Sequence, residues 1–116
     1  MRVTSDLWVA AFMRRVHAQG GFALVARKGA IEAGAIFIRV ERDDGLSDLY
    51  VPAPQSSYGD EGVSERKWVR AFESRSVPLQ RVDERLAREH SFDPDIWVVV
   101  IEDRGGRHFL GDLLCL

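Results

Sequence analysis

The chain has 116 residues, of which 46% are hydrophobic and 29% charged, a composition typical of one ordinary globular domain covering residues 1–116. Its net charge of -2 excludes a strong overall attraction to nucleic acid or to an anionic membrane. Cys115 is the one cysteine, which excludes an intrachain disulfide. The apolar residues 7–13 end at Arg14 and Arg15 and are too few to span a bilayer, so we expect a cytoplasmic protein.

A helix and a strand are predicted first along the chain. Ser5 can cap the helix, and Gly20 and Gly21 end it. Its apolar stripe has helical spacing and consists of Trp8, Val9, Phe12, Met13 and Val16. Residues 22–28 then predict a strand, and a glycine-bounded turn follows over residues 29–34.

The clearest local pattern is a β-hairpin within residues 35–54. Apolar and charged residues alternate until Asp43, Asp44 and Gly45 break the run, and a second run follows over residues 46–51. This pattern predicts antiparallel sheet with a buried face. Residues 52–65 have no periodicity and predict a long loop. Ser57 and Tyr58 at its centre are candidates for a binding loop, and a solvated connection between strands is the alternative.

The remaining elements are less regular. Residues 67–73 fit a fourth strand or a short helix, whereas a second helix begins at about Leu79 and ends at Asp93. The six apolar residues 96–101 predict a central strand that is covered on both faces. Residues 104–107 predict a tight turn into a last strand over residues 108–110. Together these elements predict an α+β fold, in which five or six mostly antiparallel strands carry two helices packed on one face.

The candidate binding residues are basic. Fourteen of the sixteen basic residues are arginine, the side chain suited to bidentate recognition of phosphate or carboxylate. A helix and its following strand can bring together Arg14, Arg15, Arg27 and Lys28. Three further residues join this cluster if the last hairpin lies alongside, namely Arg104, Arg107 and His108. The alternative interpretation is a solvated basic rim.

Motifs for common chemistry are absent from the sequence: it has no phosphate loop, no GxGxxG, no CxxC, no HExxH and no GxSxG. We therefore predict no cofactor, no metal and no catalytic residues. An enzymatic alternative rests on His90 with Asp93 or Asp95 in a cleft. The spacing of the two aspartates also fits a plain turn in which aspartate bonds its own backbone.

Five segments carry a resemblance to a known family. They are LWVAAFMRR (residues 7–15), RKGAIEAGAIFIRV (27–40), DLYVPAPQS (48–56), FDPDIWVVVIEDR (92–104) and HFL (108–110). In this order and spacing they resemble a family of short bacterial proteins of unknown function, over nearly the whole chain. The family usually has an acidic residue where this chain has Ala30. The resemblance implies a small bacterial cytoplasmic protein and implies no activity.

The favoured function is a non-enzymatic protein-interaction module, with a homodimer as one form, which meets a partner through the sheet edge or the loop over residues 52–65. The alternatives are an anion or nucleic-acid binder that uses the arginine cluster, and a small enzyme. A membrane partner is not expected.

Overall fold

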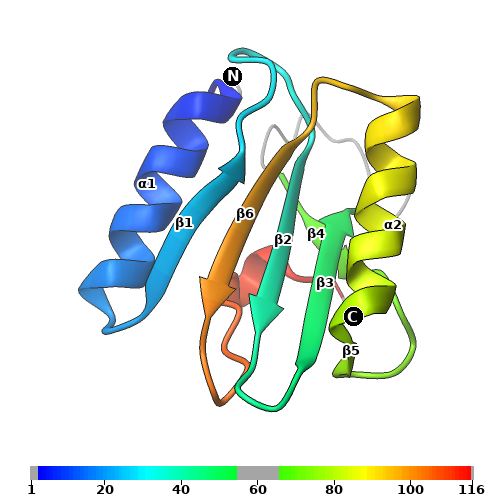
Figure 1. Ribbon diagram of the computed structural model, residues 1–116. Coiled ribbons are helices and arrows are strands. Elements are labelled where there is room, and N and C mark those ends of the chain that lie inside the picture. The colour runs from blue at the N-terminus through cyan, green and yellow to red at the C-terminus, as the bar shows by residue number, and fades with distance from the viewer. Residues whose placement is uncertain (1–2, 55–65, 116) are drawn as a thin grey trace.

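The computed structural model describes residues 3–54 and 66–115. Its elements, in chain order, are α1 (Ser5–Ala18), β1 (Phe22–Arg27), β2 (Ile36–Glu41), β3 (Leu46–Pro52), β4 (Trp68–Arg70), β5 (Val77–Pro78), α2 (Leu79–Phe92), β6 (Trp97–Glu102) and a 3₁₀ turn (Gly111–Leu113) (Figure 1). Both predicted helices and the predicted hairpin are confirmed. Within the described residues, neither helix is long and apolar enough to cross a membrane.

The strands form one six-stranded sheet in the order β1-β6-β2-β3-β4, with β5 also paired to β3. β6 and β2 are parallel, and the other neighbouring pairs are antiparallel. The α+β class and the mostly antiparallel sheet are therefore confirmed. β6 lies between β1 and β2, which confirms that the apolar run near the C-terminus forms a central strand.

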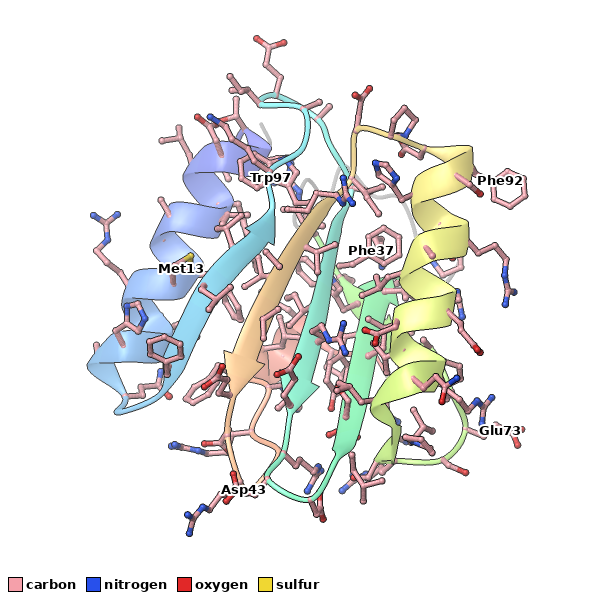
Figure 2. The ribbon with its side chains drawn as sticks, in the orientation of Figure 1. Met13, Phe37, Asp43, Glu73, Phe92 and Trp97 are labelled. Carbon is pink, nitrogen blue, oxygen red and sulfur yellow. The ribbon has the colours of Figure 1, made fainter. Side chains whose placement is uncertain are left out.

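The two helices cover opposite faces of the sheet, which corrects the expectation that both pack on one face. In β2, Ile38 packs in the same cluster as the buried residues of α1, whereas Phe37 packs with Val82 of α2. Figure 2 shows Met13 between α1 and β1, and Phe37 on the side of α2. Successive side chains of a strand point to opposite faces, and β2 and β6 are apolar at successive positions, so both faces need a cover.

The segment after β6 differs from its prediction. Residues 108–110 do not form a strand, because Phe109 has a φ of 60°, a left-handed conformation that interrupts an extended run. The segment instead crosses behind the sheet, on the face opposite α2 (Figure 1). Its end is fixed to β4, since the amide of Cys115 donates to the carbonyl of Trp68 at 2.7 Å. This path brings residues 105–109 close to β3 and β4.

The N-terminus of α1 also differs from its prediction. Ser5 does not cap the helix, because it is the first helical residue and is fully buried. Its hydroxyl donates to the carbonyl of Gly34 at 2.7 Å and so ties α1 to the turn before β2.

Candidate functional site

The four basic residues predicted to cluster lie in different surroundings. Arg14 and Lys28 are exposed, and the guanidinium of Arg15 lies 5.7 Å from the ring centre of Phe12. Arg27 lies against α2, where its Nη1 is 3.0 Å from Nε2 of His90. The structure therefore separates Arg27 from the two arginines of α1.

A register shift in β1 explains this separation. Val25 pairs with Val99, whose side chain belongs to the core on the α1 side. After the shift, Arg27 pairs with Val98, whose side chain belongs to the core on the α2 side. An irregularity of this kind turns the following side chains to the other face, and no residue type in the sequence announces it.

The other predicted candidates are two loop residues and the two aspartates that follow α2. Ser57 and Tyr58 lie outside the described residues. The carboxylate of Asp93 accepts the amide of Asp95 at 3.0 Å, which confirms the turn interpretation of these two aspartates. Within residues 3–54 and 66–115, no three His, Cys, Asp or Glu side chains are placed to hold a metal ion.

A cavity on the α1 side of the sheet gathers arginines from four separate segments. Its volume is about 360 Å³. We call it the arginine pocket and define it by six of its lining residues, which are Tyr50, Arg42, Arg70, Arg75, Arg107 and His108. They come from the end of the β2–β3 hairpin, from β3, from β4 and the loop that follows it, and from the segment after β6. Arg107 and His108 were predicted to take part in an anion site, but with other partners.

A buried carboxylate holds one side of the arginine pocket. Asp48 is 5% exposed, and its Oδ2 accepts Nε and Nη2 of Arg42 at 3.2 and 2.9 Å. Its Oδ1 accepts the amide of Ser76 at 2.5 Å. Asp48 thus fixes both the Arg42 guanidinium and the loop that carries Arg75.

Arg107 is held on the opposite side. Its Nε and Nη2 donate to Oδ1 of Asp103 at 3.1 and 2.9 Å, and its Nη1 donates to the carbonyl of Gln19 at 3.4 Å. These hydrogen bonds from Arg107 are the main reason why the pKa of Asp103 lies below its usual value. The guanidinium also lies over the ring of Phe109, 4.7 Å from the ring centre. Each guanidinium nitrogen of Arg107 therefore makes one hydrogen bond, and these bonds orient the guanidinium plane.

Arg70 and Arg75 complete the pocket with free donors. Both are exposed, and neither has a hydrogen bond or ion pair to another residue in the described part of the chain. A guanidinium is always charged and presents a fork of donors that matches phosphate or carboxylate. With Arg42 and Arg107 each balanced by an aspartate, these two arginines leave the arginine pocket with a net positive charge.

His108 and Tyr50 are neutral donors in the same pocket. Nδ1 of His108 accepts the amide of Leu110 at 3.0 Å, so the neutral ring carries its proton on Nε2. Burial, and then the charge of Arg75, lower the pKa of His108. Burial, and then the charge of Asp48, raise the pKa of Tyr50, whose ring meets that of His108 edge-on at 5.2 Å. Both groups therefore present hydrogens rather than a general base near neutral pH.

Left-handed backbone conformations surround the arginine pocket. In the described part of the chain, the two non-glycine residues with positive φ are Ser76 at 59° and Phe109 at 60°. Gly106, at 76°, lies against Arg42, and a Cβ there would overlap the Arg42 guanidinium. Such conformations are costly and concentrate at functional sites, so they mark this cavity as a candidate site.

A second cavity of about 360 Å³ lies between α2 and the sheet, with Arg27, Arg39 and His90 in its wall. Arg39 is 8% exposed, and its Nη1 donates to Asp83 at 2.7 Å. The Nε and Nη2 atoms of Arg39 are buried without a hydrogen-bond partner, and Nε lies 3.3 Å from the carboxylate of Glu41. Asp83 also lines this cavity and adds negative charge, so the arginine pocket is the stronger anion site.

The sequence alone did not reveal Arg42, Arg70 and Arg75 as site residues. Arg42 is far from Arg70 and Arg75 in the chain, and the three arginines follow no motif. Only the strand order, which places β2, β3 and β4 side by side, brings these arginines together.

The fold and the pocket define a small α+β protein with an arginine-lined cavity on one face of its sheet. The chain belongs to the DUF1491 family, described as proteins of unknown function, and the family model matches residues 3–111. This match confirms the resemblance to a family without an assigned function.

Three solved structures are similar to this chain in both sequence and fold. A crystal structure of a DUF1491 family protein from Caulobacter crescentus CB15 is 39% identical, has a TM-score of 0.78 and aligns over 98% of both chains. An NMR structure of a DUF1491 family protein from the same organism is 43% identical, with a TM-score of 0.76 over 98% of this chain and 97% of that one. The solution structure of protein Atu0922 from A. tumefaciens is 46% identical, with a TM-score of 0.74 over 89% of this chain and 87% of that one. No curated protein matches the chain.

Proposed function

We propose that the protein binds a small phosphate-bearing anion in the arginine pocket. The observation that carries this proposal is the pair Arg70 and Arg75, whose donors are free beside a cavity already lined by two fixed arginines. Hydrogen bonds from a charged donor to a phosphate oxygen are about twice as strong as those between neutral groups. The neutral donors His108 and Tyr50 add to a lining that is dominated by hydrogens and suits an acceptor-only ligand.

The same groups support binding rather than turnover. A general base has to accept a proton, but Nδ1 of His108 already accepts one hydrogen bond and Nε2 carries the proton. The two aspartates nearest the pocket are occupied by arginines. We therefore favour a binding protein over an enzyme.

The first test is calorimetric titration of the protein with inorganic phosphate and pyrophosphate at low salt. We expect the double variant Arg70→Gln/Arg75→Gln to bind pyrophosphate at least tenfold more weakly than the wild type, because two charge-assisted contacts are lost. A matched control is Arg14→Gln/Arg15→Gln, which removes the same charge from α1. Equal losses in both variants, or no binding by the wild type at millimolar ligand, would contradict the proposal.

A second candidate function follows from the edge of the sheet. β1 is the end strand of the sheet (Figure 1). Its side chains Phe22, Leu24 and Val25 are 50%, 37% and 36% exposed. An end strand offers backbone groups without a strand partner, although in β1 the amide and the carbonyl of Ala23 lie 3.3 and 3.2 Å from Nε2 of His17. Two identical edges complement one another by two-fold symmetry. We propose on this ground that two copies associate through antiparallel pairing of their β1 strands.

Sedimentation velocity over a range of concentrations tests this association. We expect a concentration-dependent dimer that Leu24→Lys shifts to monomer, because the substitution places a charge in the contact. Leu79→Lys, at a leucine on α2 with 36% exposure, is the control and leaves the dimer unchanged. A wild type that stays monomeric at the highest concentration would rule out the β1 contact.

A further inference from the structure

We infer that the anion in the arginine pocket carries a planar aromatic ring, stacked on the guanidinium of Arg107, so that its chemical class is a nucleoside phosphate. This inference rests on the proposed function and adds the organic part of the ligand. Three features of the pocket support it: its volume, the fixed plane of Arg107, and the distribution of charge around it.

The volume exceeds what a phosphate group needs. The cavity measures about 360 Å³ and so falls within the range of pockets that hold small organic molecules. It is about ten times the volume that one water molecule takes in the liquid. A ligand that fills the cavity therefore has a substantial part besides its phosphate.

Arg107 offers a flat surface whose orientation is set by three hydrogen bonds. Its Nε and Nη2 are bound by Asp103 and its Nη1 by the carbonyl of Gln19, so no nitrogen lacks an acceptor. The guanidinium carbon of Arg107 lies 4.7 Å from the centre of the Phe109 ring, and the side chain lines the pocket. A flat guanidinium that is fixed in this way stacks well on an aromatic ring, and protein arginines stack on nucleic-acid bases in this manner.

The phosphate and the aromatic ring of the ligand then bind to different segments of the pocket. Arg70 and Arg75, from β4 and the loop after it, have free donors for the phosphate. Arg107, which lies over Phe109 in the segment after β6, offers its guanidinium plane to the aromatic ring of the ligand. A nucleoside phosphate has this combination of a dianionic group and a flat aromatic base.

The surrounding charge favours a single nucleotide over a strand of RNA. Arg42 also lines a neighbouring cavity whose other charged residues are Glu41, Asp43, Glu102, Asp103 and Arg104. The acids there outnumber the arginines, and Arg104 itself forms an ion pair with Asp43. A polyanion that extends from the arginine pocket in this direction meets repulsion, whereas RNA-binding surfaces continue as a basic stripe.

The experiment compares three ligands by calorimetry on the full chain: adenosine 5′-monophosphate, ribose 5-phosphate and inorganic phosphate. We expect the wild type to bind adenosine monophosphate about tenfold or more tightly than ribose 5-phosphate, which lacks the base. Equal affinities would overturn the inference and leave the proposed phosphate binding intact. If none of the three ligands binds, the inference and the proposed function both fail.

A variant then tests Arg107 itself. Arg107→Lys keeps the charge but removes the plane, so we expect the preference for adenosine monophosphate over ribose 5-phosphate to fall to about twofold or less. Arg81→Lys is the matched control. Arg81 is on α2, outside the pocket, and its guanidinium carbon lies 4.7 Å from the centre of the Phe72 ring. An Arg107→Lys variant that is folded and keeps the full preference would exclude stacking on Arg107.

One more arm separates a free nucleotide from the end of a strand. We expect a 5′-phosphorylated RNA hexamer to bind no more tightly than adenosine monophosphate. Binding of the hexamer more than tenfold tighter would overturn the assignment to a single nucleotide.

Discussion

We expect Trp68→Ala to lower the free energy of unfolding by about 3–5 kcal/mol, the loss typical of removing a buried aromatic side chain. Trp68 is 1% exposed and its ring centre lies 4.6 Å from that of Trp8 on α1. Its indole Nε1 donates to the carbonyl of Ile36 at 2.8 Å, so the substitution also leaves that buried carbonyl without its partner. Urea denaturation followed by circular dichroism measures the change.

Two controls separate packing from hydrogen bonding in this prediction. Trp68→Phe keeps an aromatic ring and loses the donor, so it should cost clearly less than the alanine variant. Phe92→Ala removes an aromatic side chain that is 82% exposed and should leave stability within about 0.5 kcal/mol of the wild type. If Trp68→Ala also falls within this margin, Trp68 does not join α1 to the sheet in the way described.

The second large effect is expected at Asp48, where alanine should lower the free energy of unfolding by about 3–5 kcal/mol. Asp48 is the buried acceptor for Arg42 and for the amide of Ser76, and its removal leaves a cation and a buried donor unpaired. Because Arg42 lines the arginine pocket and Ser76 directly follows its lining residue Arg75, the same variant should bind phosphate more weakly. Thermal denaturation and calorimetry on one preparation measure both effects.

A double-variant cycle tests the origin of this loss. Arg42→Met removes the cation, so Asp48→Ala should destabilise the Arg42→Met protein less than it destabilises the wild type. Asp48→Asn keeps the shape of the side chain and one acceptor oxygen, so its cost should be intermediate. A loss that is the same with and without Arg42 would show that the ion pair is not its cause.

Local patterns predicted most of the elements because each pattern is decided within a few residues. The alternation that ends at Gly45, with φ of 78°, marks the hairpin, and the six apolar residues of β6 mark a central strand. The ambiguous residues around Trp68 form a strand because they pair with β3, a contact that no local pattern contains. Phe109 reads as a strand residue but adopts a left-handed conformation, since tertiary contacts override its preference.

The candidate site was predicted far less well, for a reason of geometry. Arg42, Arg70, Arg75 and Arg107 become neighbours through the order of the strands and through the path of the segment after β6. Sequence spacing carries neither piece of information. Conversely, Arg14 and Arg27 were grouped because a helix and the next strand are usually adjacent, and the shift in β1 then turned Arg27 to the other face.

The position of β6 has a consequence for how the chain folds during its synthesis. β1 and β2 are made early, yet they do not touch along the sheet, because β6 from near the C-terminus lies between them. Synthesis therefore passes through α1, the first five strands and α2 before the central strand is available, and the sheet closes only through contacts between distant residues. Until then the apolar edges of β1 and β2 are open to other chains, a state in which chaperones commonly engage nascent proteins.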